Sequence, residues 1–386
     1  MVITDGIKYR NYQEGDAQQL AHLFNIAFQQ NGASFLRTTR SWRWRYLESP
    51  GFEPKMCHIA EDIHNQKIVG AVYANMIEDV LIEGQKYKIG QINDVSCHPN
   101  YTRRGIAQFL MKKAIEYMKS KECDYSLLTA DYHGFARKRM YLKLGYKDID
   151  RMRVFANFPY PAGFLEGFPA LLPLIPLFFV NTYIPAYINK FRINKNNFLA
   201  KNDLQVEIHH NNNHEKYYAA VRHIIPQIYT GAPSFDSQTL RWQRENVPLS
   251  LYEPTYVFLK QDSRTVGAGV LSAQIIRSWK YYFSLKIGSI HDLFLDNSEF
   301  NNRRTVYFAY IVMLTELIQA ARKRNINVLF CLSHSKRKDL HRAFRGSCFL
   351  KIKGGALMLK VLKPSLSIPS SKKPFYIPTH VSMGIP

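Results

Sequence analysis

The chain has 386 residues, enough for two domains of ordinary size, and its 46% hydrophobic and 21% charged residues are typical of a globular protein. This composition excludes an intrinsically disordered chain and a protein with many membrane spans. Lysine and arginine outnumber aspartate and glutamate by 52 to 30, so the net charge of +22 attracts polyanions. Nucleic acid, an anionic membrane surface and an acidic small molecule all suit this charge, and so does a merely solvated basic surface.

The five cysteines indicate a reducing compartment. They are odd in number and scattered without a CxxC pair, at Cys57, Cys97, Cys123, Cys331 and Cys348. This pattern argues against a disulfide scaffold and against a zinc site, so we expect no metal. The first residues show no basic region leading into an apolar stretch, so no signal peptide is expected. Together these features predict a cytoplasmic protein.

The sequence repeats itself at an offset near 200 residues. Residues 88–95 (KIGQINDV) recur as 286–293 (KIGSIHDL), residues 69–71 (VGA) recur as 266–268, and Trp44 recurs as Trp242. The constant order and spacing of these matches predict a duplicated domain. We expect one copy over residues 1–158 and the other over 204–363.

Within the first copy, the pattern predicts a mixed, mostly antiparallel sheet flanked by helices. Strands are expected at 67–75, 79–82, 86–97, 125–129 and 151–158, with a hairpin turn at 83–84. After Gly105 the apolar period becomes helical, and a second helix is expected at 136–144, ended by Gly145. The fold class is therefore α/β.

Residues 159–203 match nothing in the other copy and form a very apolar linker. Four prolines interrupt the apolar run, so a membrane-spanning helix is not expected. Flanking lysines and arginines suit an interfacial segment beside anionic headgroups, while packing against both domains or lining a tunnel suits the sequence equally well. The tail, 364–386, is rich in proline and serine and is expected to be extended.

Residues 94–107 (DVSCHPNYTRRGIA) carry the strongest chemical signal. They predict a strand that passes through a basic turn into a helix. Unpaired N–H groups and the helix dipole at such a helix start favour an anion, and Gly105 lets the backbone approach it closely. The turn therefore predicts a pyrophosphate site, although a solvated basic turn that caps an ordinary helix fits the same residues.

This segment resembles the coenzyme A loop of the GNAT acetyltransferase superfamily. Residues 140–146 (MYLKLGY) resemble the second signature of that family. The resemblance covers roughly residues 5–158 and, more weakly, 204–363, and the tandem arrangement is similar to mycothiol synthases and Eis-type acetyltransferases. It implies two tandem GNAT-like domains and acetyl-CoA, or another acyl-CoA, as co-substrate.

The resemblance also implies roles for individual residues. The strand residues Val95, Ser96 and Cys97 would pair with the pantetheine arm, and the N–H group of Cys97 would serve the thioester oxygen. The pyrophosphate would be held by Arg103, Arg104, Gly105, Ile106, Ala107 and Gln108. Tyr141 would be the acid that protonates the departing thiolate. Asp94 is our candidate for the general base, although its recurrence as Asp292 also fits a structural role.

Two positions depart from the family pattern, and the second copy departs further. Thr102 stands where glutamine or arginine is usual, and Gly134 where asparagine is common. In the second copy residues 303–307 (RRTVY) replace RRGIA, and His341 stands where Tyr141 stood. A β-branched residue and a bulky tyrosine would block the pyrophosphate, so we expect the second copy to be a scaffold that walls the acceptor pocket.

These observations predict an N-acetyltransferase that acts on a small-molecule primary amine. One alternative keeps the fold but uses a long-chain acyl donor on or near an anionic membrane, which the apolar linker and the basic charge favour. Another is a catalytically silent acyl-CoA sensor, against which Gly105 and Tyr141 argue. Specific nucleic-acid binding is not expected, because no known reading module appears. Neither the amine acceptor nor the oligomeric state follows from the sequence.

Overall fold

The computed structural model describes residues 2–29, 37–163, 194–210, 214–233, 237–244, 250–278, 283–300, 302–352 and 354–376, with a few single positions between these ranges. The elements of the N-terminal half are β1 (Val2–Thr4), β2 (Ile7–Asn11), α1 (Ala17–Gln29), α2 (Thr39–Tyr46), η1 (Pro54–Met56), β3 (Cys57–Asp62), β4 (Lys67–Ile82), β5 (Gln85–Cys97), η2 (Pro99–Tyr101), α3 (Ile106–Ser120), β6 (Tyr125–Asp131), the π-helix η3 (Arg137–Tyr141) and β7 (Lys147–Asn157).

The elements of the C-terminal half follow in nearly the same order. They are α6 (Lys195–Lys201), β8 (Leu204–His209), α7 (His214–Ile228), α8 (Ser237–Arg244), β9 (Thr255–Gln261), β10 (Arg264–Ser278), β11 (Phe283–Leu295), η5 (Asn297–Glu299), α9 (Arg303–Lys323), β12 (Val328–His334), α10 (Lys338–Gly346), β13 (Leu350–Lys351) and β14 (Gly355–Val361).

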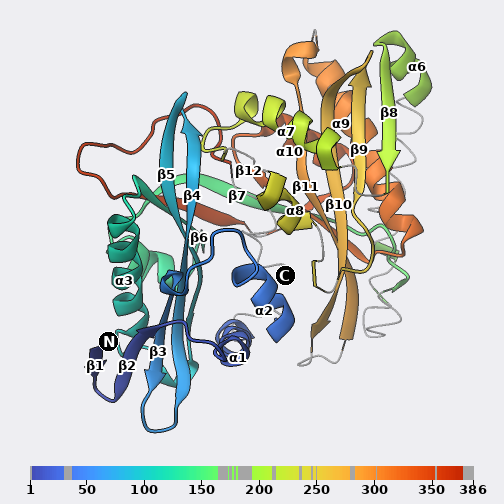
Figure 1. Cartoon of the computed structure of the whole chain (residues 1–386). Helices are drawn as coiled ribbons and strands as arrows, with labels where there is room; N and C mark the ends of the chain where they lie inside the picture. The colour runs from blue at the N-terminus through green and yellow to red at the C-terminus, as the bar shows by residue number, and fades with distance from the viewer. Residues whose placement is uncertain are drawn as a thin grey trace.

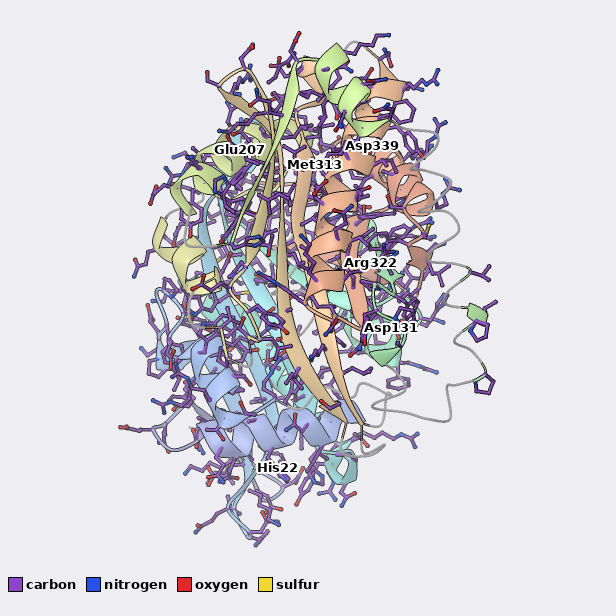
Figure 2. The ribbon with its side chains drawn as sticks, turned by 90° about the vertical axis from the view of Figure 1, so that its right-hand side faces the viewer. His22, Asp131, Glu207, Met313, Arg322 and Asp339 are labelled. Carbon is purple, nitrogen blue, oxygen red and sulfur yellow. The ribbon has the colours of Figure 1, made fainter. Side chains whose placement is uncertain are left out.

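Helices cover both faces of the sheet in each half. Figure 1 shows α3 on one face of β3, β4 and β5, with α1 and α2 on the other face, toward the C-terminal half. Figure 2 shows α9 lying along the strands of the C-terminal half, and the contacts of α9 with β9, β10 and β11 agree. Alternate residues of β9 reach opposite cores, since Val257 packs with α9 and Tyr256 with α7. The predicted α/β fold of two tandem domains is confirmed.

The two halves repeat the same strand register. In the N-terminal half β5 and β6 are parallel over four pairs, from Ile89 opposite Tyr125 to Ile92 opposite Leu128. In the C-terminal half β11 and β12 are parallel over four pairs too, from Ile287 to Ile290. Residues 88–95 and 286–293, the clearest repeat in the sequence, therefore occupy the same place in each half.

The halves exchange their last strands. In the N-terminal half β14, which comes from the end of the chain, pairs with β6 along its whole length and also with the first part of β7. The second part of β7 pairs with β12 and β13 of the C-terminal half. Each half thus receives one strand from the other, and the described strands join into one continuous sheet (Figure 1). The boundaries at residues 158 and 204 stay a prediction.

A second contact between equivalent residues joins the halves. Trp44 on α2 and Trp242 on α8 stack with ring centroids 5.4 Å apart. Each indole N–H donates to the other residue's backbone carbonyl, at 3.3 Å from Trp44 and 2.8 Å from Trp242. Because these tryptophans are matching positions of the repeat, their reciprocal bonds mark an approximate two-fold relation between the halves.

Some predicted elements differ in detail. Strands expected at 67–75 and 79–82 are one strand, β4, interrupted by an irregular pairing near Asp79, whose φ is +50°. The helix expected at 136–144 contains the short π-helix η3. Residues 195–201 of the expected linker form α6, while most of residues 164–193 lie outside the described residues. Among the described residues, no helix combines the length and apolarity that crossing a bilayer requires.

The tail returns to the C-terminal half after β14. The described part, residues 364–376, contains no helix or strand apart from one bridge between Phe375 and Thr230. Backbone bonds tie it to the end of α7, with Thr230 N–H donating to Pro374 and Tyr376 N–H donating to Thr230. The extended tail over residues 364–386 stays a prediction, and residues 377–386 lie outside the described range.

Candidate active site

The site begins where β5 and β6 separate. Their parallel pairing ends at Ile92 and Leu128, although β5 continues to Cys97 and β6 to Asp131. Beyond that point β6 still pairs with β14. The edge of β5 that faces β6 pairs with no strand among the described residues. Backbone groups of residues 93–97 on that edge can therefore bind an extended ligand, because a strand edge offers N–H and C=O groups in a row.

A bulge in β5 sets the direction of this edge. Two residues, Asp94 and Val95, oppose one residue of β4, and Asp94 has φ +48°. After the bulge, His98 N–H donates to the Val69 carbonyl of β4 at 2.8 Å. Because successive N–H groups of a strand point to opposite edges, the Cys97 N–H faces the gap between β5 and β6. An oxyanion at this place would meet a fixed backbone donor.

The predicted pyrophosphate cradle lies at the start of α3. Gly105 is the N-cap residue, with φ +79°, and it has no side chain to bond the first-turn N–H groups of α3. A Cβ at this position would meet no heavy atom within 4 Å, so the space in front of the helix is open to a ligand. Ile106 is buried against Gly70 of β4, where a Cβ would lie 2.7 Å from the isoleucine side chain. This close packing fixes the helix start beside the separating strands.

The other predicted cradle residues surround this helix start. Arg103, Arg104 and Gln108 are exposed and Ala107 is half-buried. The Arg104 guanidinium lies 5.0 Å from the Tyr101 ring centroid, and neither arginine forms an ion pair with another described residue. The structure thus brings the predicted loop residues together around a helix N-terminus with two available cations, an arrangement suited to a pyrophosphate.

The side chains of the strand residues play no visible catalytic part. Burial raises the pKa of the Cys97 thiol, which therefore stays protonated at neutral pH, and the thiol donates weakly to the Tyr101 carbonyl at 3.6 Å. The buried Ser96 hydroxyl donates to the Asp94 carbonyl at 3.1 Å. These contacts leave Val95, Ser96 and Cys97 to act through their backbone groups.

Tyr141 lies at the end of η3 and is 6% exposed. Its ring contacts Tyr146 edge-on at 6.2 Å, and the Tyr146 hydroxyl is 2.7 Å from that of Ser126 on β6. Burial raises the pKa of Tyr141 above its ordinary value of 10, so the phenol keeps its proton at neutral pH. The phenol therefore carries the proton that an acid must donate.

The two departures from the family pattern have local explanations. A Cβ at Gly134 would lie 2.9 Å from the Cβ of Asp131, so an asparagine would not fit without a shift of the turn. Thr102 bonds within the loop, its hydroxyl donating to the Pro99 carbonyl at 2.9 Å. Both residues shape the backbone around the site.

The Asp94 side chain lies in a cluster of charged groups beside α2. Its carboxylate pairs with Arg37, accepts from the Tyr46 hydroxyl, and lies 3.9 Å from Arg45 on α2. Arg37 is buried, and its guanidinium lies 3.6 Å from the Phe24 ring centroid. Burial would raise the pKa of Asp94, but the two arginines and the tyrosine hydroxyl hold it below the ordinary value. The carboxylate is therefore charged and a weak proton acceptor.

In the C-terminal half, the start of α9 is capped by a side chain of the protein. Asn302 is the N-cap of α9, and its side-chain oxygen accepts from the N–H groups of Arg304 and Thr305 at 3.0 and 2.9 Å. Tyr307 packs so close to α10 that a Cβ at Gly346 would lie 2.3 Å from its hydroxyl. An anion would have to displace the Asn302 cap to reach this helix.

A pocket of about 540 Å³ lies between the halves on the α2 side of β5. Its walls come from α2, β4 and β5 of the N-terminal half and from α8 of the other half. The lining includes Trp44, Tyr46, Tyr73, Asn75, Gln91, Asn93, Pro233 and Trp242. Asn93 follows Ile92, the last residue of β5 paired with β6, so this pocket reaches the point where the strands separate. The sequence had not singled out this lining, although the repeat linking Trp44 with Trp242 was a usable signal.

The comparisons agree with the geometry of the N-terminal half. Residues 8–149 match the family model described as an acetyltransferase (GNAT) domain. Residues 8–149 are therefore similar to a GNAT domain. A comparison with curated protein sequences gives no match.

Solved structures with the same fold extend over both halves. A Saccharomyces cerevisiae N-myristoyltransferase with bound myristoyl-CoA and inhibitors is similar with a TM-score of 0.69 and 13% identity, covering 98% of this chain and 88% of that chain. A GCN5-related N-acetyltransferase from Sphaerobacter thermophilus gives a TM-score of 0.58 at 10% identity, over 96% of this chain and 100% of that one. At these identities the likeness concerns the fold, and it includes the tandem arrangement beyond the GNAT domain.

Proposed function

We propose that this protein transfers an acyl group from acyl-CoA to a primary amine, with acetyl-CoA as the donor. The observation that carries the proposal is the separation of β5 from β6 beside the open N-terminus of α3. A strand edge followed by an anion-binding helix start matches the two parts of coenzyme A, the amide-containing pantetheine arm and the pyrophosphate. The GNAT match over residues 8–149 supports the same co-substrate.

The reaction follows from this placement. The neutral amine attacks the thioester carbonyl, a C–N bond forms, and the oxygen that becomes negative accepts from the Cys97 N–H. The C–S bond then breaks, the thiolate takes a proton from Tyr141, and the nitrogen loses one proton to water, from which Tyr141 regains its own. In this proposal Arg103, Arg104 and the first turn of α3 hold the pyrophosphate, while Val95 and Ser96 bind the pantetheine arm through their backbone.

The pocket between the halves is the proposed acceptor site. Its polar lining includes the side-chain amides of Asn75, Gln91 and Asn93, beside two carboxylate–lysine pairs, Glu53 with Lys121 and Glu78 with Lys88. A volume of about 540 Å³ lies in the range of small-ligand sites. In this proposal the C-terminal half contributes α8 as a wall and binds no cofactor of its own.

Asp94 has a different role in this proposal from that of general base. A carboxylate whose pKa is lowered by two arginines takes up a proton weakly at neutral pH. We infer that Asp94 instead positions Tyr46, which lines the acceptor pocket, and fixes the bulge that aims the Cys97 N–H.

A second candidate uses a long-chain donor. The similar N-myristoyltransferase structures contain myristoyl-CoA and cover nearly the whole chain, which favours this candidate. The net charge of +22 and the apolar run within residues 164–193, which lies mostly outside the described residues, suit work beside an anionic membrane. The predicted cytoplasmic location is compatible with either candidate.

A donor comparison tests the proposal. Release of coenzyme A thiol is measured with acetyl-CoA and with myristoyl-CoA, each against polyamines, aminoglycosides, lipid amines and peptides with free N-termini. We expect amine-dependent turnover with acetyl-CoA that Gly105→Glu removes. Turnover confined to myristoyl-CoA would select the second candidate, and tight acyl-CoA binding without turnover on any amine would indicate a sensor.

A further inference from the structure

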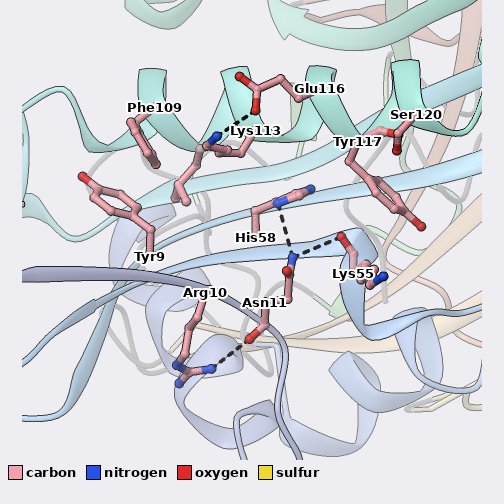
Figure 3. Close-up of a pocket in the computed structure, with 11 residues that line it drawn as sticks. Tyr9, Arg10, Asn11, Lys55, His58, Phe109, Lys113, Glu116, Tyr117 and Ser120 are labelled. Atoms are coloured by element: carbon pink, nitrogen blue, oxygen red, sulfur yellow. Dashed lines mark hydrogen bonds and ion pairs between the residues drawn. The ribbon is translucent and has the colours of Figure 1, made fainter. Parts of the chain in front are cut away.

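A second pocket lies on the far side of α3, between that helix and the strands β2 and β3. It has a volume of about 420 Å³ and is shown in Figure 3. Its lining comes from β2, η1, β3 and the middle turns of α3. It shares no residue with the separating strands, with the helix start at Gly105, or with the lining of the proposed acceptor pocket.

His58 supplies a buried donor at the centre of this pocket. The residue is 7% exposed, and its Nδ1 lies 3.4 Å from the side-chain amide nitrogen of Asn11. That nitrogen also donates to the carbonyls of Lys55 and Cys57, at 3.2 and 3.3 Å, which fixes the orientation of the amide. An amide nitrogen only donates, and its two hydrogens are shared among these three acceptors, so we assign Nδ1 as an acceptor and place the hydrogen of the neutral ring on Nε2.

The Nε2 atom is buried, and it has no hydrogen-bond partner among the residues that the structure describes. Figure 3 shows the ring between Asn11 on one side and the side chains of α3 on the other. Burial lowers the pKa of His58 to about 4, so the ring is neutral at physiological pH and offers one N–H. A buried unpaired donor costs free energy, which an acceptor atom on a ligand would recover.

The charged residues around this pocket favour a negatively charged ligand. Lys55 is exposed on η1 and forms no ion pair with another described residue, while Lys113 on α3 is 2.8 Å from Glu116. Arg10 is held by Asp16 and Glu61, so its charge is already balanced. The lining therefore keeps a positive excess, and a single N–H with one or two ammonium groups fits a monoanion better than a phosphate, which needs more donors.

The aromatic side chains of the lining favour one kind of ligand. Tyr9 and Phe109 pack with ring centroids 4.1 Å apart, and both rings are half-buried at the edge of the pocket. The Tyr117 ring meets His58 edge-on at 5.8 Å. Three aromatic rings around one cavity favour a flat apolar group.

We propose that this pocket binds a small aromatic carboxylate, whose oxygen accepts from His58 Nε2–H and whose ring packs against Tyr9 and Phe109. Lys55 attracts the carboxylate at the mouth. The site is separate from acyl transfer and does not depend on the proposed function.

Titration of the full chain tests this proposal. Protein with ¹⁵N-labelled histidine is titrated with benzoate, phenylacetate and indole-3-acetate, each compared with its neutral amide, and with inorganic phosphate. We expect at least one carboxylate to shift the His58 Nε2 resonance at saturation, with its amide binding at least ~10-fold more weakly. No His58 shift with any of the three carboxylates up to 10 mM, or a shift with phosphate alone, would overturn the assignment.

Variants separate recognition from folding. His58→Phe keeps the ring and removes the donor, and Lys55→Glu reverses an exposed charge without touching the core. Each should weaken binding of that carboxylate by about 10-fold or more, measured by calorimetry. The exposed His64→Phe is the matched control and should bind normally. Unchanged affinity in both single variants would contradict the proposed site. Displacement of the carboxylate by coenzyme A would contradict a site distinct from acyl transfer.

Discussion

Helices α3 and α9 follow equivalent strands of the two halves, but α9 begins earlier in the repeat, at Arg303, and the first turns of the two helices are capped differently. Gly105 leaves the N–H groups of α3 facing open space, whereas Asn302 bonds two N–H groups of α9 with its own side chain. Replacing an N-cap asparagine by glycine costs a helix roughly a few tenths of a kcal/mol. Gly105 therefore leaves the start of α3 open with little loss of stability.

The strands beside these helices differ far less than the helix starts. Both halves keep the four parallel pairs, and both have an irregular pairing, at Asp94 in β5 and near Asp292 in β11. In the proposed function, a half that binds no cofactor therefore needs no change of fold. The differences that we invoke lie at the helix start and at the tyrosine position.

The largest effect is expected at Tyr141. Tyr141→Phe removes the proposed acid and keeps the ring in the core, so turnover should fall by ~10²–10⁴-fold with acyl-CoA affinity retained. Its counterpart in the second half, His341→Phe, should leave turnover unchanged. Single-turnover kinetics and a melting curve check both. A Tyr141→Phe enzyme with the wild-type chemical rate would disprove the acid role, and loss of stability together with cofactor binding would make Tyr141 a packing residue.

Asp94 is the next most sensitive position. Asp94→Asn leaves the buried Arg37 without its carboxylate, and we expect a loss of ~3 kcal/mol in the free energy of unfolding. Because the pKa of Asp94 is lowered in the folded state, its contribution is complete above pH ~4 and is lost as the pH falls through the lower folded-state pKa. Denaturant titrations at several pH values should show a smaller acid loss in Asp94→Asn than in wild type. Asp79→Asn, at an exposed pair with Lys86, is the control and should change stability by less than ~0.5 kcal/mol.

Gly105→Glu should weaken coenzyme A binding by at least ~100-fold, because a carboxylate would stand where the pyrophosphate belongs. Thr305→Glu places the same charge at the matching position of α9 and should leave binding unchanged. Calorimetric titration of wild type should give one site per chain. Two equivalent sites, or equal losses in the two variants, would refute the division of roles between the halves.

The smallest effect concerns the capped helix itself. Asn302→Ala should lower the free energy of unfolding by ~1 kcal/mol, since two N–H groups of α9 lose their acceptor. Asn100→Ala, at an exposed residue of η2 in the first half, should change it by less than ~0.5 kcal/mol. Urea unfolding monitored by circular dichroism resolves this difference. Equal values would mean that the α9 cap does not stabilise the chain.

The sequence predicted those features that local patterns encode. The turn at Glu83 and Gly84 and the helix after Gly105 follow from short stretches of sequence, and the duplication follows from the match between two such stretches. All three are confirmed. The irregularity near Asp79 looked like a strand end, because a bulge and a loop use the same residue types. The exchange of β7 and β14 left no trace in either strand, since the choice of pairing partner depends on tertiary contacts.

For the candidate site, the sequence predicted the cradle better than the surrounding residues. The loop from Arg103 to Gln108 is contiguous in sequence and is read as one motif. The partners of Asp94, including Arg37, are distant in sequence and belong to no motif, so the weakened basicity of Asp94 could not be anticipated. His58 likewise gave no signal, because the burial of its Nε2 without a described partner arises only when β3 packs beneath α3.

The strand exchange has a consequence for how the protein is made. Val361 pairs with Tyr125, so β6 has no neighbour on that side until the ribosome has released the end of β14. A nascent chain carries this open edge through most of its synthesis, and open edges are where unfinished sheets stick to one another. Contacts of such long range also slow folding. The N-terminal half is the first to be synthesised and the last to be completed.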